Sequence, residues 1–136
     1  MVRIYRQKII IVTSRKPVER AINEELQWFG DSLGLFNLRD KDKSCFRVFI
    51  ELLKSTKRKQ ALSSDDLALR LNLTRGTVIH HVNKLMESGI VVYEKKKYLL
   101  RVDNLKQLVE EIRRDIDRTC SDLKEVAEEI DRRLGL

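Results

Sequence analysis

The 136 residues predict a mostly helical α+β fold in which one short β-hairpin follows a series of helices. Apolar residues recur at helical spacing over most of the chain, and two short apolar runs flank a lysine-rich turn. A heptad-like repeat occupies the last third. We expect an N-terminal extension over residues 1–42, a central domain over 43–102 and a C-terminal helix over 103–136.

A strand is expected over residues 2–13, because they alternate at first and end in a β-branched run. Pro17 suits the first turn of a helix, which is expected over 18–33, and Gly34 lies where a C-terminal cap belongs. This helix is locally acidic and carries Trp28 on a hydrophobic face. We therefore expect it to pack on the core or on the C-terminal helix, not on a polyanion.

The central domain is expected to hold three helices and the hairpin. The first helix covers about 44–57, and its apolar stripe consists of Phe46, Phe49, Ile50 and Leu53. Ser63 or Ser64 can cap a short second helix, and Thr74 can cap the third. The third helix ends at Gly89 and buries Val78, Val82 and Leu85. Strands at 90–93 and 98–102 flank the turn.

Two further observations limit the function. The chain carries 28 Lys and Arg against 21 Asp and Glu, a formal net charge of +7. The positive excess lies in the first hundred residues, which favours a polyanionic partner. No apolar run approaches the roughly 18 residues of a membrane span, and the first residues lack the pattern of a signal peptide. We therefore expect a cytoplasmic protein that does not bind membranes.

Neither catalysis nor a cofactor is expected. Cys45 and Cys120 are too far apart in sequence to suggest a zinc site. His80 and His81 point about 100° apart on a helix, so they cannot chelate one ion. His81 flanks the apolar stripe and is expected to be a partly covered packing residue. The sequence holds no Gly-rich phosphate loop, no Ser-His-Asp set and no suitable carboxylate pair. We expect no enzyme and no metal site.

The order helix, short helix, tight turn, second helix and hairpin is that of a winged helix-turn-helix. Residues 62–92, LSSDDLALRLNLTRGTVIHHVNKLMESGIVV, resemble the DNA-binding core of the ArsR and MarR families of prokaryotic transcription regulators. Residues 74–82 match their polar-x-x-Thr-Val-x-x-His-apolar recognition helix, and the resemblance covers about 45–102. The Cys-x-Cys pair of the metal-sensing members is absent, so metal sensing is not implied.

The resemblance implies sequence-specific binding of double-stranded DNA to regulate transcription. The recognition helix, 74–88, would enter the major groove, and the wing, 93–98, would lie on the backbone. The residues expected to contact bases are Arg75, Ile79, His80 and Asn83. Those expected to contact phosphates are Thr74, Gly76, Thr77, Lys84, Lys95, Lys96 and Lys97. A protein-interaction module of a transcription or replication assembly, or RNA binding, stays open as an alternative.

The C-terminal helix carries apolar or small residues at alternating spacings of four and three. We call these residues the seam: Leu105, Val109, Ile112, Ile116, Thr119, Leu123, Val126 and Ile130. Such a repeat is typical of a coiled coil. The helix would be roughly 45 Å long, too long for this domain to cover. A homodimer is therefore expected, although packing against the N-terminal helix is also possible. The sequence specifies no effector.

Overall fold

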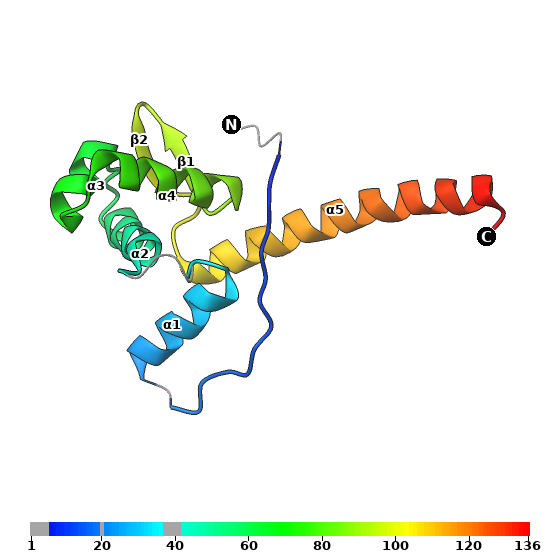
Figure 1. Ribbon diagram of the computed structural model, residues 1–136, viewed down its shortest axis with the longest axis horizontal. Coiled ribbons are helices and arrows are strands. Elements are labelled where there is room, and N and C mark those ends of the chain that lie inside the picture. The colour runs from blue at the N-terminus through cyan, green and yellow to red at the C-terminus, as the bar shows by residue number, and fades with distance from the viewer. Residues whose placement is uncertain (1–5, 20, 37–41) are drawn as a thin grey trace.

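The computed structural model describes residues 6–19, 21–36 and 42–136 (Figure 1). In chain order the elements are α1 (Ile22–Ser32), α2 (Ser44–Lys57), α3 (Ser64–Leu71), α4 (Arg75–Glu87), β1 (Val91–Glu94), β2 (Lys97–Leu100) and α5 (Leu105–Leu134). Helices α2, α3 and α4 gather with the hairpin into one body, and α5 extends away from it. The predicted fold class is confirmed. None of the helices in the described part of the chain is both long and apolar enough to cross a membrane.

Helix α2 is the centre of the core, as its broad apolar face predicts. Val48, Phe49 and Leu52 are completely buried, and α2 contacts α3, α4 and β2. Phe46 and Ile50 pack at the margin of the core and are only partly buried. The buried face is therefore rotated from the predicted stripe toward Val48 and Leu52, because α3, α4 and the hairpin all lie on that side.

Side-chain caps define the helix-turn-helix. The Ser63 hydroxyl accepts the Asp66 N–H, and the Asp66 carboxylate accepts the Ser63 N–H, each at 3.0 Å, which completes a capping box for α3. Asn72 ends α3 in the left-handed region at φ 55°. Thr74 then caps α4 by accepting the Thr77 N–H at 3.1 Å. The predicted caps at Ser63 and Thr74 are confirmed.

The hairpin is antiparallel, with Val91 paired to Leu100 and Glu94 paired to Lys97. Leu62, which precedes α3, forms an isolated antiparallel bridge to Tyr98, with backbone hydrogen bonds of 3.0 and 2.7 Å in the two directions. The hairpin is thereby fastened to the start of α3 as well as to α2.

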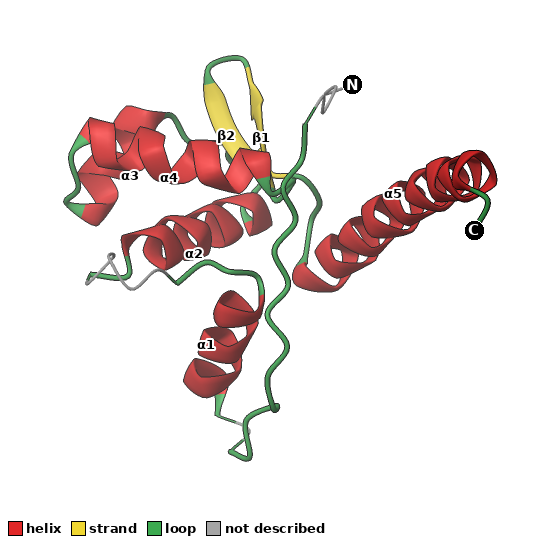
Figure 2. Cartoon of the chain, turned by 45° about the vertical axis from the view of Figure 1, so that its right-hand side comes forward, coloured by secondary structure: helices red, strands yellow, loops and turns green. Residues whose placement is uncertain are grey.

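The strand expected over 2–13 is wrong for its described part. Residues 6–13 are extended but belong to no sheet, and residues 2–5 lie outside the described residues. The segment instead makes separate contacts: Lys8 N–H donates to the Glu87 carbonyl at 2.9 Å, and Val12 N–H donates to the Ser32 carbonyl at 2.8 Å. It passes between α1 and α5 (Figure 2). The β-branched run predicts extended backbone, but none of the described residues forms a strand that pairs with it.

Helix α1 begins at Ile22, four residues later than expected, so Pro17 precedes the helix and does not open it. Its packing on the core is confirmed: Phe29 stacks on Phe49 with ring centroids 6.5 Å apart. Gly30 lets α1 approach α2 closely, because a Cβ there would lie 2.8 Å from the Phe46 ring. The predicted C-terminal glycine is also confirmed, since Gly34 has φ +70° just after the helix.

A buried ion pair joins α5 to the central domain. Asp115 of α5 is only 2% exposed and accepts hydrogen bonds from Arg101, which follows β2, and from Gln7 at 3.0 Å. Gln7 also donates to the Ser88 carbonyl at 3.1 Å. It lies so close to Gly89 that a Cβ there would be 2.1 Å from Gln7 Nε2. One carboxylate thus connects the N-terminal segment, the exit of the hairpin and α5.

The environment of Asp115 favours its charged form. Burial is the largest influence and by itself raises the pKa of the carboxyl group. Hydrogen bonds from Arg101 and Gln7, with the charges of Arg101 and Arg118, outweigh burial, and the pKa of Asp115 lies below its usual range. The hydrogen bond to Asp115 likewise raises the pKa of Arg101. Both groups are therefore charged at neutral pH.

The two halves of the seam differ in how far their own chain covers them. Ile112 is buried within its own chain, and Leu105 and Ile116 pack against the core while keeping some exposure. Leu108, which lies outside the seam, is completely buried. The central domain covers one side of the first half of α5. From Thr119 onward the seam is exposed.

We expect Asp115→Asn to lower the free energy of unfolding by about 2–4 kcal/mol, because it leaves the largely buried Arg101 with Glu111, at 3.3 Å, as its remaining counterion. The native pKa of Asp115 is depressed, so its stabilisation is full above the unfolded value of 3.8 and is lost as the pH falls further. Denaturant unfolding between pH 2.5 and 7 measures both effects. The acid-induced loss should be smaller in Asp115→Asn.

The matched control is Asp117→Asn, which removes an exposed carboxylate two residues further along α5. It should leave stability within about 0.5 kcal/mol of the parent. Equal stabilities of the two variants would contradict a structural role for the buried pair.

Candidate nucleic-acid interface

One face of α4 is free because the opposite face is fully used by the core. Val78, Val82 and Leu85 are completely buried. The four residues predicted to contact bases lie on the rest of the helix surface: Arg75, His80 and Asn83 are exposed, and Ile79 is half-buried. The helix therefore presents a guanidinium, an imidazole and a carboxamide on its surface, with an aliphatic side chain partly covered among them. These groups match the chemistry of base edges and of the thymine methyl group.

The two adjacent histidines have different surroundings. His81 is 8% exposed and packs with the buried face of α4, as predicted. His80 is exposed, and its ring centroid lies 5.3 Å from that of His81. His80 is thus available to a ligand, whereas His81 contributes to the core.

The first turn of α4 can contact a phosphate through its backbone N–H groups more than through its side chains. The Thr74 hydroxyl accepts the Thr77 N–H and donates to Thr77 Oγ1 at 2.8 Å, so it is engaged in the cap. A Cβ at Gly76 would meet nothing within 4 Å, so no packing inside the chain demands glycine there. A helix N-terminus attracts phosphate, and glycine lets a backbone approach closely. Lys84 is half-buried at the other end of the helix.

Arg75 is exposed but has a partner inside the chain. Its Nε lies 3.7 Å from Asp65 Oδ1, and both side chains are largely exposed. An exposed pair of this kind contributes little, about 0–1 kcal/mol, so Arg75 can exchange Asp65 for another acceptor at low cost. Arg75 also influences Tyr98 on the hairpin: burial raises the pKa of Tyr98, and the charge of Arg75 acts in the opposite direction.

The tip of the hairpin is built from lysines in a conformation that lysine disfavours. Lys95 and Lys96 form a two-residue turn with φ of 51° and 65°. Two positive φ values are the geometry of a type I′ turn, for which Asn-Gly is preferred. Left-handed backbone costs an ordinary residue about 1–2 kcal/mol. The turn itself therefore gives no reason for lysine at these positions. Lys95, Lys96 and Lys97 are all exposed.

The hairpin lies beside the start of the helix-turn-helix. The pKa of Asp66 is lowered, first by its hydrogen bonds with Ser63 and to a smaller degree by the charge of Lys97. The charge of Lys97 thus lowers the pKa of Asp66 in the first turn of α3, and the charge of Arg75 acts to lower that of Tyr98. The bridge between Leu62 and Tyr98 holds the hairpin beside the start of α3, and α3 contacts α4, so the helix-turn-helix and the lysine-bearing hairpin form one continuous region.

Sequence reasoning missed two residues of this region. Tyr93 is 47% exposed on β1, and its ring lies 4.8 Å from that of Tyr98. The alternation of the two strands was the available signal. Arg47 of α2 donates from Nη2 to the Leu71 carbonyl at 2.6 Å and so holds the end of α3. Nothing in its sequence neighbourhood indicated this contact, because it spans 24 residues.

Residues 50–92 match the winged helix-turn-helix DNA-binding family. The chain contains a winged helix-turn-helix domain. The match begins within α2, covers α3 and α4 and ends in β1, so it includes most of the body described above but not β2. No curated protein and no solved structure matches the chain significantly. The predicted winged helix-turn-helix is confirmed, and its assignment to the ArsR and MarR families stays a prediction.

The winged helix contains no evident metal centre. Among residues 6–19, 21–36 and 42–136 no three His, Cys, Asp or Glu side chains are grouped to hold an ion. Cys45 is buried in α2 and Cys120 is exposed on α5, far along the chain from the histidines.

We expect the double substitution Lys95→Asn, Lys96→Gly to raise the free energy of unfolding by about 1–2 kcal/mol, because Asn-Gly fits the type I′ turn. Thermal and denaturant unfolding measure the change. Lys97→Asn is the control, since Lys97 lies in β2, outside the two positive-φ positions, and its replacement should bring no such gain. A double variant no more stable than the parent would contradict the strain assigned to the wing tip.

Proposed function

We propose that the chain binds double-stranded DNA sequence-specifically as a homodimer and thereby regulates transcription. The observation that carries this proposal is the free face of α4 beside the lysine wing, within a domain that matches a DNA-binding family. The face is mostly polar, and its acceptors, donors and methyl-sized apolar surface suit the major groove.

The two parts of the surface would do different work. Arg75, His80 and Asn83 project from α4 and would contact base edges, with Ile79 beside them. Arg75 is the strongest candidate because arginine binds guanine through two hydrogen bonds. The wing lysines carry no preference for a base and would neutralise phosphates. The first turn of α4, with Gly76, would approach the backbone.

The homodimer rests on the exposed half of the seam. Leu123, Val126 and Ile130 are 64%, 57% and 49% exposed in the single chain. A contiguous apolar stripe of this kind is unusual on a monomer and marks an interaction site. A second copy of α5 supplies a stripe of the same shape. Two-fold symmetry would also present two recognition helices to a symmetric operator.

A protein or RNA partner is the remaining alternative. A protein partner would favour a largely apolar outer face on α4, whereas only Ile79 is apolar among the four predicted base contacts. RNA helices have a deep, narrow major groove that a recognition helix does not enter. The observed face therefore supports DNA better than either alternative.

We expect Arg75→Ala to cost about 1–3 kcal/mol on a selected cognate duplex and much less on random duplex. The wing variant Lys95→Asn, Lys96→Gly should weaken binding to both duplexes alike. It should also flatten the plot of log K against log salt by up to about 1.8, or about 0.9 for each phosphate that is no longer neutralised. Titrations at several salt concentrations measure both effects.

Lys124→Ala, which removes one exposed cation from α5, is the control for charge alone. It should leave the cognate preference and the salt slope close to those of the parent. If Arg75→Ala and the wing variant both bound DNA like the parent, helix and wing would not be the DNA interface, and the protein-partner alternative would lead.

We expect Leu123→Asp, Val126→Asp to yield a folded monomer, because the substitutions place charge in the dimer contact while both positions are exposed in the single chain. Sedimentation velocity measures the mass, and circular dichroism reports folding. Ser121→Asp, Lys124→Asp adds acid to exposed positions off the seam and should stay dimeric. A Leu123, Val126 variant that sediments as a dimer would contradict the proposed contact.

A further inference from the structure

The exposed half of α5 is wider than a two-stranded seam. Beside Leu123, Val126 and Ile130 it carries Leu134, which is 68% exposed, and the small residue Ala127. A stripe of this width is typical of helices that contact more than one neighbour. A surface broader than a single helix edge would therefore cover it best.

The first half of α5 leaves only a narrow apolar strip uncovered. One side is covered by the central domain through Leu108 and Ile112. Val109 is still 46% exposed, and Leu105 and Ile116 are only partly covered. A narrow apolar strip thus runs beside the domain, and it needs one further helix to cover it.

The spacing of these residues relates the two halves to each other. Two copies of α5 can pair antiparallel about a point midway between Thr119 and Cys120. Residues equally distant from that point, one on each side of it, then lie opposite one another. This symmetry sets Ile116 against Leu123, Val109 against Ile130, and Leu105 against Leu134. Each pair joins a partly covered residue of the first half with an exposed one of the second.

Charge favours the same arrangement. Residues 121–131 carry five acidic side chains and one lysine. In a parallel pair this acidic stretch would face its own copy, and the same holds for a short antiparallel overlap of the two C-terminal halves. In the full antiparallel overlap it faces residues 108–118, where three arginines nearly balance four acidic residues. Like charges directly opposite one another destabilise a contact, so the full overlap is preferred.

The length of α5 supports full overlap over partial overlap. Thirty residues give roughly 45 Å of helix, whereas pairing the exposed halves alone would use roughly half of that. Stable interfaces bury about 1,200–2,000 Å² in total. A contact along the whole helix, which also touches the partner's domain, comes closer to this area than one limited to about four turns.

We infer that two copies of the chain pair through α5 along its full length, antiparallel, with the two-fold axis near Thr119 and Cys120. The inference rests on the proposed homodimer and adds its geometry. The C-terminal half of each α5 then lies against the first half of its partner, beside the partner's winged helix. The apolar half of each α5 is covered by a helix and a domain together.

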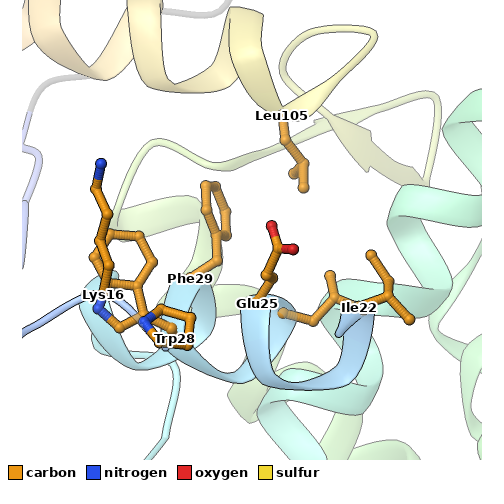
Figure 3. A pocket seen from close by; sticks show the side chains of 8 residues that line it. Lys16, Ile22, Glu25, Trp28, Phe29 and Leu105 are labelled. Atoms are coloured by element: carbon orange, nitrogen blue, oxygen red, sulfur yellow. The ribbon is translucent and has the colours of Figure 1, made fainter. Parts of the chain in front are cut away.

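A cavity at the start of α5 fits this arrangement. It measures about 390 Å³ and lies between α1, the segment before it and the first turn of α5. Figure 3 shows Phe29 and the Glu25 carboxylate rising from α1 toward Leu105, with Ile22 on one side of them and Trp28, next to Lys16, on the other. In the antiparallel pair, Leu134 of the partner subunit arrives beside Leu105. The partner's helix end would therefore close this apolar opening.

Single-cysteine variants of the full chain test the geometry. Cys120→Ser removes the exposed thiol, and Cys45 is buried. On this background, Lys106→Cys and Arg133→Cys place thiols near the two ends of α5. In the antiparallel pair identical thiols lie 27 residues apart along the axis, roughly 40 Å, whereas unlike thiols lie side by side. A short bismaleimide should therefore crosslink a refolded mixture of the two variants and neither variant alone. The parent should crosslink through Cys120.

The outcomes separate the inference from the proposed dimer. A parent chain that sediments as a monomer would overturn both. A dimer in which Arg133→Cys crosslinks to itself would retain the dimer and overturn the antiparallel pairing. A dimer in which the mixture and Cys120 both fail to crosslink would overturn the full overlap.

Trp28 supplies an independent measurement, because it is the chain's single tryptophan and lines the cavity. Leu134→Asp should shift its emission in the dimer, since the partner's helix end then brings charge to the opening. Lys124→Asp, on the outer side of α5, should leave the emission unchanged. A dimer in which Leu134→Asp also leaves the emission unchanged would overturn the contact with the cavity.

Discussion

The buried pair of Asp115 and Arg101 determines how the parts of this molecule are held together. Burying two charges is costly and is tolerated only when each finds good partners. Here the Arg101 guanidinium makes two hydrogen bonds to the carboxylate, and Gln7 and Arg118 each donate one more. Because the pair connects the hairpin exit with α5 and with the N-terminal segment, it converts three separate pieces of chain into one body. Apolar contacts at Leu108 and Ile112 add stability, but they specify the angle between α5 and the central domain less strictly than directed hydrogen bonds do.

This connection would have a functional consequence for the proposed dimer on DNA. The distance between two recognition helices must match the distance between two half-sites. If α5 mediates dimerisation, that distance is transmitted from α5 through Asp115 and Arg101 to the hairpin and then to α4. A flexible attachment would leave the spacing undefined and add an entropic cost to binding. The rigid attachment instead favours one spacing.

The proposed DNA surface is organised so that affinity and specificity reside on different elements. The core fully occupies one side of α4, so its reading side chains are carried by a rigid helix. The wing lysines occupy strained positions at the end of a short hairpin, where stability of the fold alone would select other residues. Local strain at an exposed and charged turn is characteristic of functional sites. It is consistent with the polyanionic partner that the net charge predicts.

The sequence alone determined most of the local structure. The spacing of Val78, Val82 and Leu85 predicted the buried face of α4, and hydroxyl residues at 63 and 74 predicted the caps, because these features depend on neighbours within a few residues. The side chains predicted to read bases follow from the same periodicity, and their role in binding stays a prediction.

Only the tertiary structure decided the features that depend on distant partners. The β-branched run at 9–12 has strand propensity, but a strand needs a neighbour, and the described part of the chain pairs none with it. The seam repeats evenly along α5, yet its first half is partly covered because Asp115 fastens that half to the domain. No local pattern predicts a contact between Gln7 and Asp115 across 108 residues, since its energy depends on a burial that exists only once the chain has folded.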